Sequence, residues 1–548
     1  MFGFIIRLVY LVININANNL NCDEAMLILN AREIIKNGTD ILGNSYPYNF
    51  NTWLSGGQSC VGTYIVSIMY WLFGNNLYAL RLPIVVLNCI GLIFVYKIIN
   101  EITTNNRIKE LTLLVFVSSP FLISQSIWNL DCLYSIPFFL FGLYNLIYSI
   151  NNKKYSRLII SMFWLALSSH SYMLNALPIT LFLLIYAIIL LIKKKIKFRY
   201  IIIAIFSYIV FLSPLIVYML VQFNLIKPLT IFGMSFYSAN SSEGRMNNIL
   251  ISNFLGHNYN ILNVAVDYLK YSVINFLEIF LGVDINYNSP EHLFVYSNIL
   301  NFHYIFMFPI MIFGLVTTKK TELYKSALLS SLFFIFLLSP IFYEAFYRVM
   351  LIFIFFWFIT GYGLEKIYTL INKKVFYDTF FKSVCIILCS LTILFIPTYS
   401  NRLQNIDALR TKANSHKVVL SKMMNKNKNI IIIEDKQNDI ESDFFEKIGV
   451  FSTYYDSEDN IVPFKEYFPN ICSATLKGRL KGKRVYQKLS KDNRVAFVPL
   501  ENIQEMTADY YFTVSENAKK EIIKKLPKNY KYQTVDQYYT MFYKTKNI

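Results

Sequence analysis

Long uncharged apolar runs dominate the sequence, and they restrict its fold more than any other feature. Two examples are LPITLFLLIYAIILLI at 177–192 and LIFIFFWFITGYGL at 351–364. A helix needs about 20 apolar residues to cross a bilayer. A soluble chain of 548 residues would need a polar surface, yet only 16% of this one is charged. We therefore predict an all-α polytopic membrane protein.

About eleven segments fit the pattern of a membrane span when short and interrupted ones are included. They lie near residues 2–17, 77–98, 110–125, 131–150, 157–169, 173–192, 200–221, 301–317, 325–342, 347–364 and 383–398.

The basic residues gather in alternate loops between these spans. Lys and Arg occur at 107–109, 153–157, 193–199, 319–325 and 365–374, whereas 124–131 and 168–175 contain neither. The positive-inside rule explains the net charge of +18 better than a nucleic-acid partner does. It predicts a cytoplasmic N-terminus. The segments predicted to lie outside are 18–75, 124–131, 168–175, 222–300, 339–347 and the C-terminus.

The composition changes near residue 400, where the apolar spans stop. Residues 1–400 are predicted to form the transmembrane domain, and 401–548 a small extracytoplasmic α/β domain. The second part has strand-like runs alternating with helical stretches, which is typical of such a domain. The runs are 429–435, 494–500, 509–514 and 538–544, with a helical stretch at 515–526.

Few ionisable residues stand at the predicted outer ends of the spans. Asp23 and Glu24 follow the first span, Asp131 ends the loop 124–131, and His170 ends another span. Glu344 and Arg348 precede a late span at the same level. A single residue of this kind is as often a helix end in headgroup water as a functional group. Several of them on one side, in separate loops, favour a shared site.

These residue types fit one reaction well. A carboxylate at the membrane surface can act as a general base that takes a proton from a hydroxyl. A guanidinium can hold a phosphate through two hydrogen bonds. Together they suit the transfer of a sugar from a lipid phosphate, in which the hydroxyl attacks the anomeric carbon and the lipid phosphate leaves.

Five motifs follow one another along the chain. They are CDEA (22–25), WLFGNNLYALRLP (71–83), SSPFLISQSIWNLDCL (118–133), LALSSHSYMLNALPI (165–179) and YEAFYRVMLIFIFFWFITGYGLEKI (343–367). Their order resembles that in the membrane glycosyltransferases of the GT-C class, which include protein O-mannosyltransferases and the aminoarabinose transferase that acts on lipid A. The resemblance covers roughly residues 1–370 and implies a GT-C fold.

The resemblance implies roles for particular residues. Asp23 is similar to the catalytic carboxylate, Asp131 to a second acid facing the same cavity, and Arg348 is placed to meet the lipid-linked phosphate. Glu24 could orient Asp23, or bind a sugar hydroxyl or a metal. Outer loops 18–75 and 222–300 are predicted to form the site. Its catalytic residues are Asp23, Glu24 and Asp131, and its substrate-binding residues are Arg348, Arg245, Gln58, His170 and Glu344.

Two positions depart from the family pattern. Gln58 occupies the part of the first loop where some relatives have a Lys-Pro-Pro element, and Ile127 stands where several have an arginine before the second acid. The phosphate contacts are therefore expected from Arg348, Arg245 or Lys227.

The predicted activity is inverting transfer of a sugar from a polyprenyl-phosphate donor to a hydroxyl of a lipid, glycan or protein, at the outer face of the cell membrane. Membrane lipids are expected partners, and nucleic acid is not. His257 and His292 are far apart in the sequence, so no metal site is predicted. Whether a divalent cation takes part is left open.

Two alternatives belong to other functional classes. A flippase or transporter of lipid-linked glycans would carry charges in mid-membrane and show two similar halves. A polymerase or ligase of such glycans would have an arginine-rich outer loop.

Overall fold

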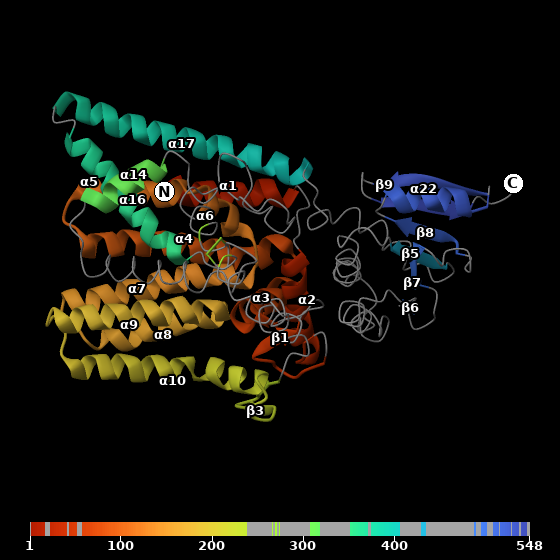
Figure 1. The fold of residues 1–548 in the computed structure, drawn as a ribbon, viewed down its shortest axis with the longest axis horizontal. Coiled ribbons are helices and arrows are strands. Elements are labelled where there is room, and N and C mark those ends of the chain that lie inside the picture. The colour runs from red at the N-terminus through yellow and green to blue at the C-terminus, as the bar shows by residue number, and fades with distance from the viewer. Residues whose placement is uncertain are drawn as a thin grey trace.

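A computed structural model gives the fold, a bundle of helices followed by a separate mixed sheet (Figure 1). The residues that it describes are 2–16, 22–40, 43–51, 57–237, 266, 269–270, 273, 307–317, 351–370, 374–405, 429–434, 487–488, 495–500, 508–513, 516–527, 529–535 and 539–544.

The first 405 residues supply the helices of the bundle. The α-helices are α1 (Phe2–Asn16), α2 (Cys22–Asn37), α3 (Cys60–Phe73), α4 (Leu77–Ile102), α5 (Asn106–Ser118), α6 (Pro120–Ser124), α7 (Ser135–Asn151), α8 (Arg157–Ser171), α9 (Ala176–Ile192), α10 (Phe198–Gln222), α14 (Met307–Thr317), α16 (Leu351–Leu370) and α17 (Lys374–Asn405). Short 3-10 turns are η1 (Gln125–Ile127), η2 (Asp131–Tyr134) and η3 (Met173–Asn175).

Several helices have the length and apolar composition of membrane spans. Within the described residues these are the stretches Leu77–Ile102, Asp131–Asn151, Met173–Ile192 and Phe198–Gln222. Each coincides with a predicted span to within a few residues, so the mostly helical, multi-pass character of the chain is confirmed. The total of eleven spans stays a prediction, and the one at 325–342 lies outside the described residues.

The core of the bundle is centred on α7, which is buried along most of its length between α4 and α8. Aromatic side chains fill it, with Phe138 stacked on Trp164 and Phe139 edge-on to Phe355. In contrast, α10 presents a largely exposed apolar surface. A helix that is apolar on its exposed side is expected to face lipid, so α10 lies at the rim of the bundle.

Close helix contacts depend on small residues. A Cβ atom on Gly361 of α16 would overlap the side chain of Thr112 on α5 and lie 2.7 Å from its Cα. Gly361 therefore allows the two backbones to approach, as small residues commonly do in membrane helices.

We expect Gly361→Ala to push α16 away from α5. Overpacking of this kind costs about 1–3 kcal/mol, and we expect a lower midpoint of thermal unfolding in detergent. The matched control is Gly91→Ala on α4, where the new Cβ would lie 3.4 Å from Leu140 Cδ1, an ordinary contact. Equal stability of the two variants would contradict this account of the α5–α16 packing.

The loop between α1 and α4 contains more helix and strand than the sequence suggests. It contains α2, the apolar helix α3, and the paired strands β1 (Asn49–Asn51) and β2 (Gly57–Ser59). In Figure 1, α2 lies across the end of the bundle instead of along it. A second hairpin, β3 (Leu229–Ile231) and β4 (Met234–Phe236), follows α10 directly.

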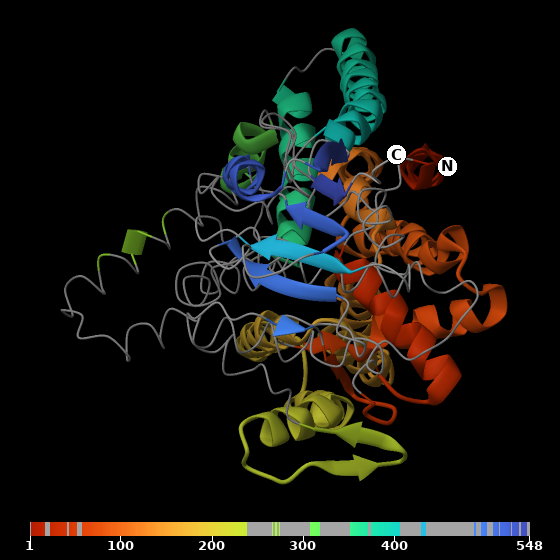
Figure 2. The ribbon, with the colours of Figure 1, turned by 90° about the vertical axis from the view of Figure 1, so that its right-hand side faces the viewer.

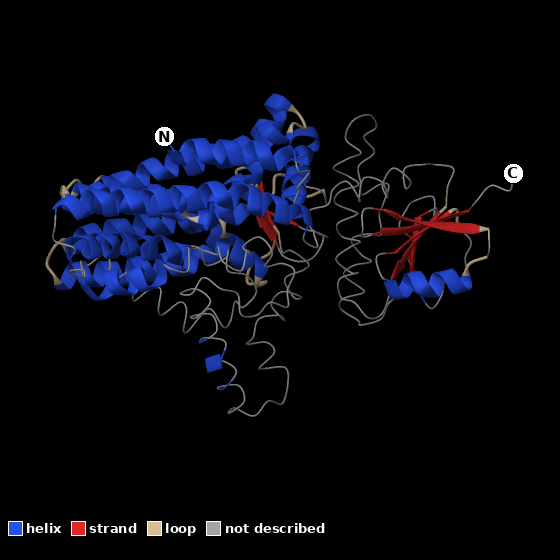
Figure 3. Ribbon diagram, turned by 90° about the horizontal axis from the view of Figure 1, so that it is seen from above, coloured by secondary structure: helices blue, strands red, loops and turns tan. Residues whose placement is uncertain are grey.

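The C-terminal part forms a six-stranded mixed sheet in the order β6-β7-β5-β8-β10-β9. Its core packs Ala518 and Ile522 of helix α22 (Glu516–Lys525) against Ile431 and Ile433, so α22 covers one face (Figure 3). The strands are β5 (Ile430–Glu434), β6 (Gln487–Lys488), β7 (Val495–Pro499), β8 (Tyr510–Thr513), β9 (Tyr530–Val535) and β10 (Tyr539–Lys544). Four of them and α22 fall on predicted runs. The extracytoplasmic location of this domain stays a prediction.

Candidate active site

The predicted acidic motifs lie at one end of the helical bundle. The start of α2, the start of α4 and the turn from η1 to η2 all meet there. These segments are distant in sequence, and specific polar contacts join them.

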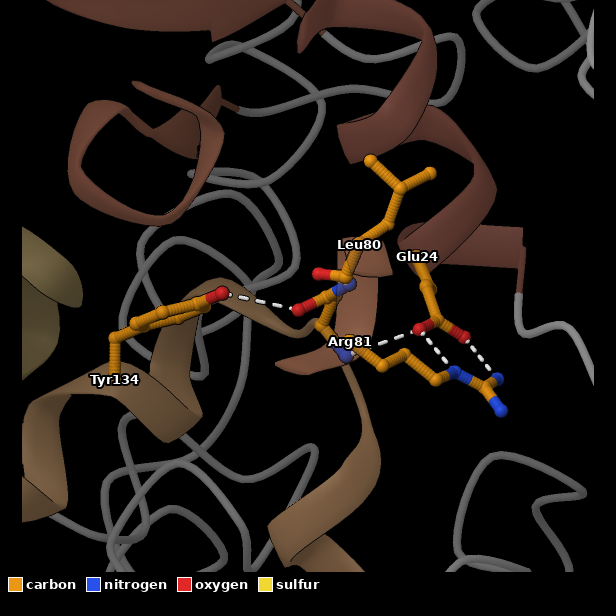
Figure 4. Close-up of polar contacts among 5 residues, drawn as sticks. Glu24, Leu80, Arg81 and Tyr134 are labelled. Carbon is orange, nitrogen blue, oxygen red and sulfur yellow. Dashed lines mark hydrogen bonds and ion pairs between the residues drawn. The ribbon is translucent and has the colours of Figure 1, made fainter. Parts of the chain in front are cut away.

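Glu24 and Arg81 form a buried ion pair that ties α2 to α4 (Figure 4). Both side chains are completely buried. Arg81 Nε donates to Glu24 Oε1 at 2.7 Å, and Arg81 Nη2 donates to Glu24 Oε2 at 2.5 Å. Two parallel bonds of this kind fix the orientation of both groups, since the planar guanidinium matches the carboxylate. The guanidinium also lies over the ring of Trp128, 4.9 Å from its centroid.

The turn before η2 completes this cluster through Asn129. Its backbone N–H donates to Glu24 Oε1 at 3.2 Å, and its side-chain amide donates to the carbonyl of Leu80 at 2.8 Å. The hydroxyl of Tyr134 donates to Asn129 Oδ1 at 2.9 Å. Buried polar groups are stable only when their hydrogen bonds are made. This network therefore holds the turn, α2 and α4 in one arrangement.

Asp131 joins the same turn to the first loop. Its Oδ2 atom accepts a hydrogen bond from the backbone N–H of Ser59 at 3.1 Å, and Oδ1 accepts one from the N–H of Cys132 at 2.8 Å. Its side chain is only partly buried. Ser59 is the residue before α3, and its hydroxyl donates to the carbonyl of Ser171. The carboxylate of Asp131 is thus oriented while part of it stays accessible.

The predicted binding residue His170 is partly buried between the first loop and α10. His170 Nδ1 lies 2.5 Å from the hydroxyl of Tyr48, and Nε2 lies 2.8 Å from the carbonyl oxygen of Phe211. Because a carbonyl only accepts, Nε2 carries the proton and Nδ1 accepts from Tyr48. Burial raises the pKa of Tyr48, which keeps its hydroxyl a donor. A substrate could reach either nitrogen only by displacing one of these partners.

We expect Tyr48→Phe to loosen the first loop. The variant leaves Nδ1 of the partly buried His170 without its donor, which costs about 1–3 kcal/mol. Limited proteolysis should cut the first loop faster than in the wild type. Tyr46→Phe is the matched control because that ring is 48% exposed. Equal cleavage rates for Tyr48→Phe and the wild type would contradict the idea that the Tyr48–His170 hydrogen bond holds the first loop in place.

The other predicted residues differ in what the structure describes. Gln58 lies in β2, buried beside Ser59. Asp23 is the second residue of α2. Arg245, Glu344 and Arg348 lie outside the described residues. Among the side chains that are described, no group of three His, Cys, Asp or Glu is arranged to hold a metal ion.

Sequence reasoning did not select Arg81, Asn129, Tyr134 or Ser59. The sequence did contain a signal for Arg81. It is a charged residue inside an apolar span, and such a residue needs a partner. Asn129 and Ser59 bind the two acids through their backbone N–H groups, and a backbone contact of this kind leaves no trace in residue type.

One protein-family model matches part of the chain. The family model for dolichyl-phosphate-mannose-protein mannosyltransferases matches residues 58–218, which include Arg81, Asp131 and His170. No curated protein matches the chain.

Solved structures share the fold over most of its length. ArnT from Cupriavidus metallidurans bound to undecaprenyl phosphate superposes with a TM-score of 0.54 at 9% identity, covering 99% of this chain and 98% of that one. Its apo form gives 0.52 at 9% identity, with 98% and 97% covered. The oligosaccharyltransferase of Archaeoglobus fulgidus gives 0.50 at 11% identity, with 82% and 61% covered.

The predicted recognition is therefore confirmed: the fold is that of a GT-C membrane glycosyltransferase. Within this class the chain is similar to ArnT and to the protein mannosyltransferases. At these identities the structural likeness establishes the fold alone, and the family model matches only residues 58–218.

Proposed function

We propose that the chain transfers a sugar from a polyprenyl-phosphate donor to an acceptor hydroxyl at the outer face of the cell membrane, with inversion at the anomeric carbon. One observation carries this proposal. The carboxylate of Glu24 accepts from the N–H of Asn129, and Asp131, two residues further on, holds its own carboxylate against the N–H groups of Ser59 and Cys132, at one end of a multi-pass bundle. A site at a bundle end suits a substrate whose lipid tail stays in the bilayer.

The charge distribution supports the proposed side of the membrane. At or beside the opposite ends of α4, α8 and α9 stand Arg107 at the start of α5, and Lys153, Lys154 and Lys193 in loops. Short loops rich in Lys and Arg remain cytoplasmic. The acidic end of the bundle then faces outward, and the N-terminus before α1 is cytoplasmic.

The proposed roles follow the chemistry of a single displacement. Asp23 accepts the proton of the acceptor hydroxyl while the oxygen of that hydroxyl bonds to the anomeric carbon of the sugar. The bond to the lipid phosphate breaks on the opposite face, and its electron pair leaves with the phosphate. One displacement inverts the anomeric configuration.

The supporting residues divide into positioning and binding groups. We propose that Glu24 fixes the start of α2 through Arg81, so that Asp23 is presented in a constant place. Asp131 is proposed as the second acid that faces the substrate. Arg348 and Arg245 are proposed to hold the phosphate, and Gln58, His170 and Glu344 to border the sugar.

The proposed donor class draws on a relative. One ArnT structure contains undecaprenyl phosphate, a polyprenyl phosphate. We extend this lipid class to the present chain. The acceptor is a hydroxyl of a lipid, glycan or protein.

The test is sugar transfer by the purified chain in nanodiscs, using a panel of polyprenyl-phosphate sugars and acceptor hydroxyl compounds. Labelled sugar should move to an acceptor from at least one donor. Movement of intact lipid-linked glycan across the bilayer without any transfer would favour a flippase instead. Extension or attachment of a whole glycan would favour a polymerase or ligase.

A further inference from the structure

The β3–β4 hairpin lies at the rim of the bundle. Figure 1 places it beyond the end of α10, and Figure 2 shows it on the outside of the helices. Its two strands are joined by Phe232 and Gly233, with Ile231 paired to Met234. Phe232 at the tip is fully exposed, at 105% relative to an extended reference.

The backbone at the tip does not explain the choice of phenylalanine. Phe232 has φ +52° and Gly233 has φ +81°, which is the pattern of a type I′ turn. Asn or Gly is favoured at the first of these positions because a left-handed backbone crowds a bulky side chain. A fully exposed phenylalanine there is unfavourable in water and in backbone geometry. Another contact must therefore favour it.

The apolar surface that surrounds the tip continues the lipid-facing side of α10. On α10, Ile205, Phe206 and Ile209 are at least half exposed. After the helix ends, Phe223 and Leu225 are 48% and 69% exposed. Exposed apolar residues thus occur both along the membrane span and in the segment that joins it to the hairpin.

Lys227 stands between this apolar segment and β3, and it is exposed. Apolar and aromatic side chains beside a lysine are typical of a segment at the boundary between headgroups and acyl chains. We propose that the β3–β4 hairpin inserts its tip into the outer leaflet of the bilayer at this boundary. The partner is the lipid surface itself, with Phe232 and Leu225 among the acyl chains and Lys227 at the headgroups.

The hairpin also contacts the loop that borders the candidate site. Ser235 N–H donates to the carbonyl of Tyr46 at 3.0 Å, and Tyr48 N–H donates to the carbonyl of Ser235 at 2.9 Å. Phe236 stacks on Tyr48 with ring centroids 5.2 Å apart. The hydroxyl of Tyr237 donates to Asp40 Oδ2 at 2.8 Å. Bilayer contact at the tip would therefore hold the first loop at a fixed height above the membrane.

The test is lipid cross-linking, which does not depend on sugar transfer. The photoreactive residue p-benzoylphenylalanine replaces Phe232 in the full chain, in nanodiscs of phosphatidylethanolamine and phosphatidylglycerol. The same label at Leu184 of α9, 55% exposed on a membrane span, is the positive control. The label at Tyr532 of β9, 52% exposed, is the negative control. Lipid adducts are measured by mass spectrometry after irradiation.

We expect lipid adducts at position 232 close to the yield at position 184 and at least about tenfold above position 532, as for a side chain in the headgroup and acyl boundary. Adducts at 232 with protein alone, from this chain or a second copy, would overturn the proposal. The absence of adducts at 232 beside a strong signal at 184 would also overturn it. If the label at 232 prevents folding, Leu225 carries it with the same expectation.

Discussion

Asp23→Asn should remove sugar transfer while leaving the chain folded. An amide cannot accept the proton of the acceptor hydroxyl, and a general base contributes about 10²–10⁴-fold to the rate. We therefore expect kcat to fall by about that factor, with little change in the retention of the lipid donor. The measurement is transfer of labelled sugar by protein in nanodiscs, with folding checked by gel filtration.

Two companion variants locate the base. Glu101→Gln removes an acid at the opposite end of the bundle, where Glu101 accepts from Asn151 and Asn152, and its activity should match the wild type. Asp131→Asn tests the second acid. Full transfer by Asp23→Asn together with its loss in Asp131→Asn would move the base to Asp131. Loss in neither variant would make Glu24 the remaining candidate.

The membrane fold could be predicted because its signal is local. The run 177–192 is apolar at every position except Thr180, and a span of this type needs no partner to be recognised. The first loop gave no such signal. Helix α3 is only 14 residues long, too short for the template of a span, and β1 and β2 have three residues each. These elements are held by distant partners, since α3 packs against α2, α4 and α8, and the carbonyl of Asn49 in β1 accepts from the hydroxyl of Tyr237 after β4.

The C-terminal sheet shows the same distinction. Strands β5, β7, β8 and β10 coincide with apolar or aromatic runs that the sequence displays. Strand β9 was missed, although its sequence YKYQTV alternates aromatic or branched residues with polar ones. It lies at the edge of the sheet with Lys531 and Tyr532 exposed, so it has no buried apolar run of the kind that marks β5 and β8. The two-residue β6 has too little sequence to carry any pattern.

For the candidate site, the sequence revealed the acids but not what holds them. Asp23, Glu24 and Asp131 stand out because carboxylates are rare in this chain. The pairing of Glu24 with Arg81 spans 57 positions, and no local period relates the two. The resemblance to the family marked WLFGNNLYALRLP as a motif but gave its arginine, Arg81, no role. The role of Arg81 as the partner of Glu24 becomes visible only in the fold, where α2 lies against α4.

Breaking the Glu24–Arg81 pair should destabilise the chain strongly. Each partner is completely buried, so removing one leaves an uncompensated charge, which costs about 3–5 kcal/mol. We expect both Glu24→Gln and Arg81→Met to unfold at clearly lower temperature in detergent. The matched control is Glu521→Gln, which removes the exposed Glu521–Lys524 pair of α22 and should leave the midpoint unchanged.

The double variant Glu24→Gln with Arg81→Met separates stability from positioning. With both charges gone, most of the lost stability should return, because a buried pair replaced by neutral groups is often close to neutral in free energy. Sugar transfer should stay low, because the double variant lacks the two hydrogen bonds that fix the start of α2 and with it Asp23. If transfer recovers in step with the unfolding midpoint, the pair serves stability alone. If transfer stays low in a stable double variant, the pair positions the catalytic end of α2.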